Sequence, residues 1–352
     1  MEFASDNASG AAPEILAAVT AVNAGAAPSY GADASMARVR ALVRETFAAP
    51  EAEVYLVATG TAANSLSLAC HCPPWGAIYA HASAHVDTDE CGAPEFYIGG
   101  GKIVRIAAPD GKLTPGILKA AIEATPQGFV HSHQRGMVTI TNTTEAGTVY
   151  SPAEVAALTA IARDHALPVH MDGARFANAV VAADCSPAEM TWKAGIDVLS
   201  FGGTKNGCMG VEAVVLFDPA KAWEFELRRK RGGHLFSKHR FLSAQMEAYL
   251  TGDLWRRLAA RANTMAERLA AGIAAIPEAS LLHPCEANMV FAYLPRRLHR
   301  RLMERGAHYY FWPVDPPAEG PDDEPLAARF VCSWETRDAE IDDFLAVIRD
   351  RD

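Results

Sequence analysis

Val198-Leu199-Ser200-Phe201-Gly202-Gly203-Thr204-Lys205-Asn206-Gly207 is the stretch from which the fold can be read. Its first three residues form a short β-type run, which predicts a buried strand. Glycines follow this run and lie on either side of Lys205, and their lack of side chains lets a flat ligand approach the amine closely. We therefore interpret Lys205 as a residue that carries chemistry at the end of a strand.

Five further β-type runs precede this stretch, and helical segments separate several of them. One predicted helix has Ser151 as its N-cap and Pro152 at its first position, and it extends toward Asp164. Strands that alternate with helices predict an α/β fold around a mostly parallel sheet. Ligands bind at the carboxyl ends of such strands, so the residues after each run are candidates for function. The five runs are residues 54–57, 77–80, 102–106, 136–140 and 168–171.

The pattern changes after about residue 228, where long helical segments begin. Residues 254–276 form one amphipathic pattern that predicts a long helix, and a last helix with Thr336 as its cap is expected near the C-terminus. We therefore expect a large ligand-binding domain, residues 1–250, and a smaller α+β domain, residues 251–352. The remaining expected elements are strands at 289–293 and 329–334, a helix around 298–305 and a solvated loop at 313–325.

Composition and charge exclude several classes of protein. The chain has 352 residues, of which 50% are hydrophobic and 21% charged, so it can bury a core without disulfides. Its 32 basic and 42 acidic residues give a net charge of −10. This charge argues against a nucleic-acid or membrane-surface partner and favours a small molecule.

The sequence contains no apolar stretch long enough for a membrane span, and its opening residues lack the pattern of a signal peptide. A cytoplasmic protein is therefore expected. Seven cysteines, an odd number at irregular spacing, indicate reduced thiols. Cys70-His71-Cys72 is not followed by a second ligand pair, so no metal site is expected.

Three other features follow predicted strands. Thr59-Gly60-Thr61-Ala62-Ala63-Asn64 turns from a strand into a helix, whose free N–H groups and dipole suit a phosphate. His170-Met171-Asp172-Gly173-Ala174-Arg175 places an acid directly after a β-type run and an arginine three positions later. His81-Ala82-Ser83-Ala84-His85 again follows a strand. Neither G-x-x-x-x-G-K-[ST] nor G-x-G-x-x-G occurs, so these features do not indicate a nucleotide site.

A phosphate cradle, an acid and a lysine are together the groups that hold pyridoxal phosphate (PLP). With these residues in this order, the chain resembles the fold-type I PLP-dependent enzymes over nearly its whole length. Within them it is similar to the threonine aldolase and β-eliminating lyase family, in the branch of low-specificity L-threonine aldolases with Ser-Phe-Gly-Gly-Thr-Lys-Asn-Gly around the lysine. Further matches are Ser5-Asp6-Asn7, Tyr30-Gly31-Ala32-Asp33, Asp89-Glu90-Cys91-Gly92-Ala93-Pro94-Glu95 and residues 329–334.

The resemblance implies a role for each matching residue. Lys205 would bind PLP as a Schiff base, and Asp172 would keep the pyridine nitrogen protonated, because a nearby negative charge favours the charged form. Arg175 would bond the phenolic oxygen of the cofactor, and His85 would stack on its ring. The phosphate would be bound by Gly60, Thr61 and Thr204, and Arg240 lies where the family has a functional arginine.

The same resemblance implies which residues bind the substrate and that subunits associate at the site. Arg329, opening its strand, would hold the substrate α-carboxylate through a bidentate ion pair. Ser5 and Tyr30 match active-site residues, and Tyr30 would reach into a neighbouring subunit. Family members build their sites at subunit interfaces, so a homo-oligomer, a dimer or a homotetramer, is expected. The site itself should be locally basic through Lys205, Arg175 and Arg329.

The implied reaction is the retro-aldol cleavage of L-threonine, L-allo-threonine and related β-hydroxy-α-amino acids, phenylserine among them, into glycine and an aldehyde. Better-known members of the family contact the substrate hydroxyl with the histidine of a Glu-Asn-Thr-His-Asn segment. Here the segment is Thr141-Asn142-Thr143-Thr144-Glu145, and the hydroxyl of Thr144 is not a base near neutral pH. His85, acting through a water molecule, is therefore the candidate base, with His133 as a second choice. The preference between threo and erythro substrates stays open.

Two other interpretations stay open as well. A β-eliminating lyase or an aminotransferase acting on a small amino acid would use the same Lys205 and Asp172. The chain could instead be a PLP-binding protein that has lost catalysis. The presence of Arg175 and Arg329 beside the lysine and the acid argues against this last interpretation.

Overall fold

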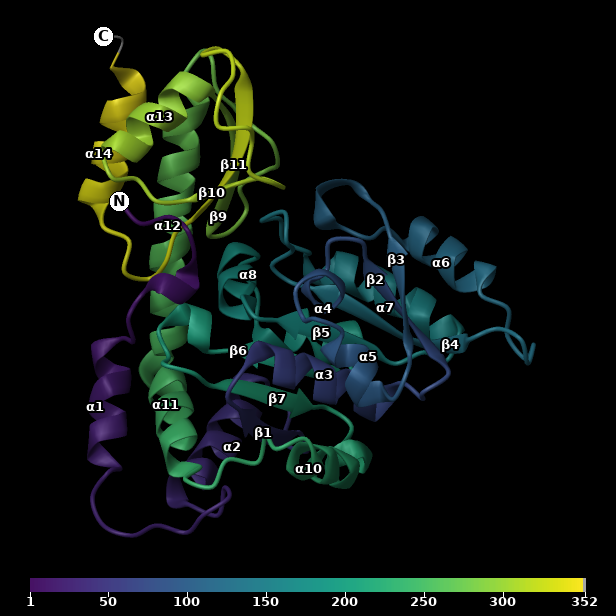
Figure 1. Cartoon of the computed structure of the whole chain (residues 1–352). Coiled ribbons are helices and arrows are strands. Elements are labelled where there is room, and N and C mark those ends of the chain that lie inside the picture. Colours follow the sequence, from purple (N-terminus) through teal and green to yellow (C-terminus); the bar gives the residue numbers. More distant parts are fainter. Residues whose placement is uncertain (351–352) are drawn as a thin grey trace.

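The computed structural model describes residues 1–350, which form two sheets connected by a long helix (Figure 1). The larger sheet has the spatial order β1 (Glu53–Val57), β7 (Glu212–Leu216), β6 (Val198–Gly202), β5 (Val169–Gly173), β4 (Gln134–Thr141), β2 (Gly76–His81) and β3 (Lys102–Ile106). β7 runs antiparallel to both of its neighbours, whereas β2 to β6 pair in parallel. The expected mostly parallel α/β sheet is confirmed, and each of the six β-type runs overlaps a strand.

β7 is the strand of the large sheet that the sequence interpretation missed; the short strands β8 (Ser280–Leu281) and β10 (Tyr310–Phe311) were missed as well. β7 follows the glycine-rich stretch after β6 with no α-helix between the two strands. A parallel strand would require a long crossover connection, and this connection is too short for one. β7 therefore pairs antiparallel to β6, with Gly202 opposite Glu212. This pairing brings the Glu212 side chain next to the stretch that carries Lys205.

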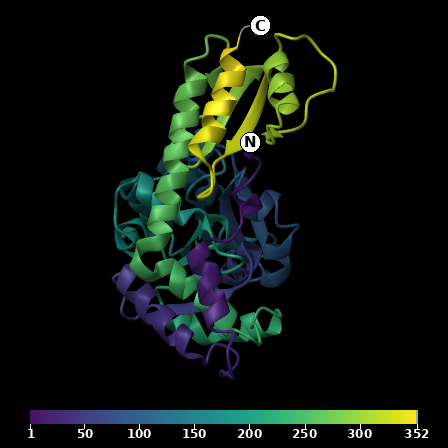
Figure 2. The same cartoon turned by 90° about the vertical axis from the view of Figure 1, so that its left-hand side faces the viewer.

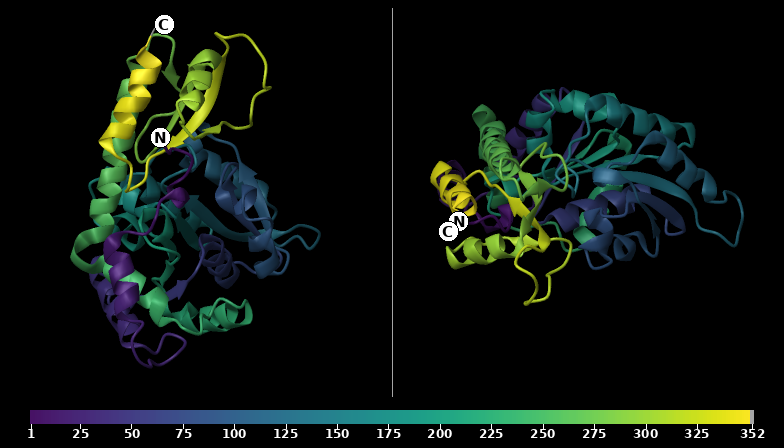
Figure 3. Two further views of the ribbon diagram at one scale, coloured as in Figure 1. Left: turned by 60° about the vertical axis from the view of Figure 1, so that its left-hand side comes forward. Right: turned by 90° about the horizontal axis from the view of Figure 1, so that it is seen from above.

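The large sheet is buried on both faces, as sheets with mostly parallel strands are. Along β1, Val54 and Leu56 belong to the main core, whereas Tyr55 and Val57 pack in a cluster on the other face. Helices cover both faces (Figure 3). The main core is covered by α1 (Pro13–Ala21), α2 (Ala34–Thr46), α6 (Pro115–Ala124), α7 (Pro152–Asp164), α8 (Phe176–Ala182), α9 (Pro187–Met190) and α11 (Arg240–Leu250), and the other face by α3 (Gly60–His71), α4 (His85–Thr88), α5 (Ala93–Ile98) and α10 (Ala222–Arg231).

Two helices confirm their sequence signals. At the start of α7, Ser151 Oγ accepts a hydrogen bond from the N–H of Glu154, and the Glu154 carboxylate accepts one from the N–H of Ser151. α12 (Leu254–Ala274) is the expected long helix, and it connects the two sheets (Figure 2). Within residues 1–350, no helix combines the length and the apolarity needed to cross a membrane.

The second sheet is antiparallel, in the order β10 (Tyr310–Phe311), β11 (Pro325–Val331), β9 (Met289–Pro295) and β8 (Ser280–Leu281). α13 (Arg296–Glu304) and α14 (Asp338–Arg349) complete this part of the chain. The strand expected at 329–334 covers residues 325–331 instead, because its pairing with β9 begins opposite Pro295. Thr336 is not the cap of α14: its hydroxyl accepts from the N–H of Ser333 in the preceding turn, and Arg337 is the residue before the helix.

The first residues of the chain pack against the second sheet. The N–H of Phe3 donates to the carbonyl oxygen of His308, and the carbonyl oxygen of Phe3 accepts from Val331, both at 2.8 Å. The Phe3 ring is buried in the core of this sheet. The division of the chain at residue 250 stays a prediction. The N-terminal segment belongs to the first part in sequence but packs against the second sheet, so it joins the two parts.

We expect that Gly202, the last residue of β6, tolerates no side chain. A Cβ atom there would lie 2.7 Å from the carbonyl carbon and 2.8 Å from the Cα of Ala174. These are backbone atoms and cannot move aside, so Gly202→Ala should lower the free energy of unfolding by about 1–3 kcal/mol or more. Urea denaturation followed by circular dichroism measures this change.

Gly116→Ala is the matched control for this variant. A Cβ atom at Gly116 in α6 would meet no atom within 4 Å, and alanine is the better helix former, so stability should stay equal or rise. Equal stability of the two variants would contradict the close approach at Gly202.

Candidate active site

Lys205 lies in a single 3-10 turn directly after β6. Asn206 anchors this turn, because its side-chain amide donates to Tyr249 Oη at 2.7 Å and to the carbonyl oxygen of Trp255 at 2.8 Å. Tyr249 Oη in turn donates to the carbonyl oxygen of Gly202 at 3.2 Å. The Lys205 side chain is half-buried, and no described residue forms a hydrogen bond or a close ion pair with its amine. The backbone is thus held while the amine stays available.

Glu212 faces the same turn from β7. Its carboxylate accepts hydrogen bonds from the N–H of Gly203, at 2.8 Å, and from the hydroxyl of Thr204. Burial raises the pKa of Glu212 to about 7, against the opposing effects of these bonds and of Lys205. The Thr204 hydroxyl also accepts from the N–H of Val211 at 3.1 Å. Thr204 is therefore engaged within the turn, and its contact with a phosphate stays a prediction.

Asp172 lies at the end of β5, opposite Ser200 on the neighbouring strand. The residue is buried, and its two carboxylate oxygens accept hydrogen bonds from the N–H of Ala174 and from the side-chain amide of Asn64, both at 3.0 Å. A buried charge requires such partners. Asp172 is therefore a fixed carboxylate at the carboxyl edge of the sheet, on the strand next to the one that leads to Lys205.

A chain of buried polar groups extends from Asp172 to His85. Asn64 donates to Asp172 and also to Glu90 Oε1, at 2.9 Å. The same Glu90 oxygen lies 2.9 Å from His85 Nδ1. The hydrogen bond with Glu90 raises the pKa of His85 against the effect of burial, whereas burial raises the pKa of Glu90 against the effects of its bonds to His85 and Asn64.

Arg175 forms a buried ion pair with Asp6. The two side chains make a bidentate contact, Nε to Oδ2 at 2.7 Å and Nη2 to Oδ1 at 3.0 Å, and Asn288 donates to the same carboxylate at 3.1 Å. Burial raises the pKa of Asp6, but Arg175 and Lys205 together lower it to below its usual value. Asp6 supplies the counter-charge that the buried Arg175 guanidinium requires, and the basic character of the site stays a prediction.

Arg329 lies in the second half of β11 and not at the start of a strand as expected, because β11 begins earlier. Its Nη2 donates to the carbonyl oxygen of Ala4 at 3.3 Å, and its guanidinium lies 5.7 Å from the ring centre of Tyr310 and 5.8 Å from that of Trp312. Nε is buried and has no hydrogen-bond partner among the described residues. Burial and the positive charge of Arg175 lower the pKa of Arg329, against the opposing effects of Glu145 and Asp6.

The start of α3 has the expected form. Thr59 is its N-cap, and the Thr59 hydroxyl accepts from the N–H of Ala62 at 3.2 Å. Gly60 and Thr61 lie in the first turn, and a Cβ atom on Gly60 would meet no atom within 4 Å, so the space beside this turn is open. The same helix carries Asn64, so it connects the expected phosphate site to the Asp172 network.

The last three expected residues are Ser5, Tyr30 and Arg240, and they do not all lie at the site of their own chain. Ser5 lies on the N-terminal segment that reaches it. Tyr30 is 48% exposed and lies with its ring 5.0 Å from the amine of Lys230, and Arg240 donates to the carbonyl oxygen of Gly25 at 2.8 Å. The connection between α1 and α2, to which Tyr30 and Gly25 belong, is at the end of the molecule opposite the second sheet (Figure 1). Within one chain, neither Tyr30 nor Arg240 has a described contact with the site.

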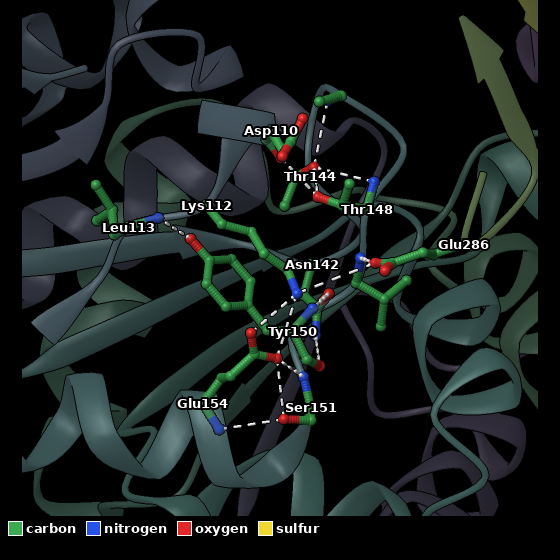
Figure 4. A network of polar contacts seen from close by, with 12 residues as sticks. Asp110, Lys112, Leu113, Asn142, Thr144, Thr148, Tyr150, Ser151, Glu154 and Glu286 are labelled. Atoms are coloured by element: carbon green, nitrogen blue, oxygen red, sulfur yellow. Dashed lines mark hydrogen bonds and ion pairs between the residues drawn. The ribbon is translucent and has the colours of Figure 1, made fainter. Parts of the chain in front are cut away.

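Thr144, at the position of the family histidine, belongs to a buried network of hydroxyl and backbone groups (Figure 4). Its Oγ1 lies 2.8 Å from Thr148 Oγ1 and accepts from the N–H groups of Ala146 and Thr148, both at 3.2 Å. The Thr148 hydroxyl donates to the carbonyl oxygen of Asp110 at 2.6 Å. Thr144 therefore stabilises its own loop, Thr148 links that loop to Asp110, and the Thr144 hydroxyl is fully used within the network.

Two more titratable residues flank β4. Glu145 follows the carboxyl end of this strand, is half-buried, and interacts electrostatically with His85, Arg175 and Arg329. His133 precedes β4 and so lies at the opposite edge of the sheet. The geometry does not bring His133, the second choice for the base, to the site.

The sequence matches the family described as "Beta-eliminating lyase" over residues 2–297. The chain belongs to the β-eliminating lyase family. It is 42% identical over 348 residues to the low specificity L-threonine aldolase of a Pseudomonas species, covering 99% of this chain and 97% of the relative. It is 43% identical over 335 residues to the low specificity L-threonine aldolase of Pseudomonas aeruginosa, covering 95% and 93%. The solved structure of Leishmania major threonine aldolase is similar at a TM-score of 0.91 and 29% identity, covering 99% and 98%.

These findings confirm the resemblance stated from the sequence, and the residues of this β-eliminating lyase family member fit PLP. The Lys205 amine has no partner among the described residues, and Asp172 presents a buried, hydrogen-bonded carboxylate. The open space beside Gly60 at the start of α3 can take a phosphate. A reactive amine, a fixed carboxylate and a phosphate cradle are the groups that PLP requires.

Five residues at this site were not selected from the sequence: Asp6, Asn64, Glu90, Glu145 and Glu212. The first four lie inside sequence segments quoted above, near residues that were selected as candidates. Their acid or amide side chains could therefore have been recognised as partners of those candidates. Glu212 gave no such signal, because its strand was missed.

Asp6→Asn should destabilise the enzyme, because it leaves Arg175 buried without a counter-charge. We expect the free energy of unfolding at pH 7 to fall by about 3–5 kcal/mol. Folding lowers the pKa of Asp6 below 3.8, so its contribution is present above that pH and is lost as the pH falls through the lower, folded-state pKa. In urea titrations at decreasing pH, wild type and variant should therefore converge below about pH 4.

Glu123→Gln is the control for Asp6→Asn. Glu123 is exposed and pairs with Lys119 on the same helix at 3.8 Å, so the loss should be less than about 1 kcal/mol. If the free energy of unfolding fell equally in the two variants, the ion pair of Asp6 with Arg175 would contribute no more to stability than an exposed pair.

Thr144→Val tests the structural role of this hydroxyl. The variant keeps the shape of the side chain but leaves the N–H groups of Ala146 and Thr148 without an acceptor, so the free energy of unfolding should fall by about 1–3 kcal/mol. Thr144→Ser keeps the hydroxyl and should restore most of the loss. Urea denaturation of both variants measures this difference, and wild-type stability of Thr144→Val would refute the role.

Proposed function

We propose that this chain catalyses the PLP-dependent retro-aldol cleavage of L-threonine, L-allo-threonine and related β-hydroxy-α-amino acids, including phenylserine, to glycine and an aldehyde. The observation that carries the proposal is that Lys205 directly follows β6, while the buried Asp172 lies at the end of β5, the strand next to it. The two Pseudomonas relatives support the choice of substrate, because they match nearly the whole chain.

PLP, when bound, supplies an electron sink for the pair released as the Cα–Cβ bond of the substrate breaks. Lys205 would hold the cofactor covalently, Asp172 would keep its pyridine nitrogen protonated, and His85 would cover one face of its ring. The remaining contacts would come from Gly60, Thr61 and Thr204 to the phosphate and from Arg175 to the phenolic oxygen. The ion pair with Asp6 supports this last role, because it fixes the guanidinium before the cofactor binds.

Arg329 would bind the α-carboxylate of the substrate. Its unpartnered Nε and its neighbour Arg175 favour an anion at this place. A carboxylate held by a planar guanidinium cannot rotate freely, so Arg329 would also fix the direction of the Cα–Cβ bond. Ser5, on the segment whose Ala4 carbonyl holds Arg329, would contact the same substrate.

His85 would accept the proton of the substrate β-hydroxyl, directly or through one water molecule. The hydroxyl of Thr144 is committed to the network around Thr148 and has no comparable basicity. General-base assistance of this kind contributes about 10²–10⁴-fold to the rate. The proton leaves the hydroxyl oxygen as the carbonyl group of the departing aldehyde forms.

We further infer that the enzyme works as a dimer or tetramer in the cytoplasm. Tyr30 and Arg240 have no described contact with the site of their own chain, which supports a role in the site of a neighbouring subunit. All seven cysteines are free thiols, as is usual for cytoplasmic proteins. Residues 1–250 would form the cofactor-binding domain and residues 251–352 the smaller domain that supplies Arg329.

A product assay tests the proposed reaction. We expect acetaldehyde and glycine from L-threonine and L-allo-threonine, and benzaldehyde and glycine from phenylserine. Lys205→Ala should lose the visible absorption of the bound cofactor and reduce kcat by at least about 10³-fold, because the covalent link is gone. Lys119→Ala on the exposed surface of α6 is the control and should behave as wild type.

The assay also separates the alternatives. Pyruvate from serine or cysteine, with no acetaldehyde from threonine, would identify a β-eliminating lyase instead, and transfer of the amino group to a keto acid would identify an aminotransferase. Cofactor absorption that stays unchanged on addition of glycine or L-threonine would indicate a protein that binds PLP without catalysis.

A further inference from the structure

His85 and Glu90 form the outer part of the buried polar chain that begins at Asp172, and neither Glu90 nor Asn64 in this chain has been given a function so far. The His85 side chain is 33% exposed, whereas that of Glu90 is 0% exposed, although the two are joined by the 2.9 Å contact between Nδ1 and Oε1. The backbone between them is short, and the turn continues through Cys91 and Gly92, both with positive φ. The buried Glu90 carboxylate thus lies against the Nδ1 side of the imidazole.

The contact determines which nitrogen of His85 carries the hydrogen. An ionised carboxylate only accepts hydrogen bonds, so the hydrogen lies on Nδ1 and points to Glu90. In the neutral imidazole the other nitrogen, Nε2, then has a free lone pair. No described residue bonds Nε2, and the exposed part of the side chain leaves it accessible.

Asn64 bonds the same carboxylate oxygen of Glu90 as His85 does. Its Nδ2 donates to Glu90 Oε1 at 2.9 Å and to Asp172 Oδ2 at 3.0 Å, so one amide group bridges two buried carboxylates. A buried carboxylate without donors would be costly and would tend to take up a proton. A protonated Glu90 could no longer hold His85 in the same way.

We propose that Glu90 and Asn64 are positioning residues for proton transfer: Glu90 holds His85 so that Nε2 is the proton acceptor, and Asn64 holds Glu90 by bridging it to Asp172. This inference rests on the proposed role of His85 as the base. In the step, the proton of the β-hydroxyl moves to Nε2 while Glu90 balances the positive charge that forms on the ring. The base and the carboxylate that faces the cofactor thereby belong to one network.

Three carboxylates act on His85 from the elements around it: Glu90 from the turn after α4, Asp172 from β5 and Glu145 from the loop after β4. Glu90 is the one of these that shares a hydrogen bond with the ring. Removal of its charge should therefore have the largest effect, and removal of the Glu145 charge a smaller one.

Glu90→Gln is the decisive variant, because it removes the charge and keeps the shape and a hydrogen-bond acceptor. The readout is the titration of His85 in the full-length enzyme with PLP bound and without substrate, followed by NMR with ¹³C-labelled histidine. The signal is assigned by its loss in His85→Asn. We expect the pKa of His85 to fall by at least about one unit, and the acid limb of kcat/KM to move to lower pH by a similar amount.

Two further variants make the result specific. Glu90→Asp keeps the charge but shortens the side chain, so it should recover part of the His85 pKa, which a loss of packing would not produce. Glu123→Gln makes the same chemical change on an exposed helix face and should leave the titration unchanged. An unchanged pKa of His85 in Glu90→Gln, or a shift of the same size in Glu123→Gln, would overturn the inference.

The two readouts separate this inference from the proposed function. A lower His85 pKa in an enzyme that releases no aldehyde from any β-hydroxy amino acid would support the pairing and refute the aldolase reaction. Aldehyde release with a pH profile that does not move in Glu90→Gln would support the reaction and overturn the role of Glu90.

Discussion

The ion pair between Asp6 and Arg175 is the constraint on which the site depends. Asp6 belongs to the N-terminal segment, Arg175 follows β5 of the large sheet, and Asn288, which donates to the same carboxylate, comes from the chain that leads into β9. Three parts of the molecule therefore meet at one buried carboxylate. Because separation of a buried charge pair is costly, this contact fixes the distance between the large sheet and the sheet that carries Arg329.

The parts of the fold that the sequence predicts are those with a local signal. Apolar runs between helical segments identify six strands of the large sheet, and Ser151 and Pro152 mark the start of α7. β7 was missed because its role is to pair antiparallel between β6 and β1, and no feature inside the segment specifies that position. The pairing of Asp6 with Arg175, 169 residues apart, depends likewise on the finished fold. Local patterns identify the residues that carry the chemistry, whereas the partners that hold them are distant in sequence.

Thr144, at the position where the resemblance implies a histidine, has a structural role in this chain. The hydroxyl of Thr144 bonds Thr148 within the loop after β4, and the Thr148 hydroxyl in turn donates to the carbonyl oxygen of Asp110. The next residue, Glu145, adds a negative charge near His85 and both site arginines. The residues expected to bind the cofactor are all present beside this added charge.

α12 links the unfolding of the two sheets, because it belongs to both hydrophobic cores. Its first turns bury Trp255 and Ala259 in the main core, and its later turns bury Leu269 and Ile273 in the core of the second sheet. Neither core can lose this helix without exposing apolar surface in the other. Unfolding of either core therefore removes apolar contacts that hold α12 in the other, so the stabilities of the two sheets are coupled through this helix.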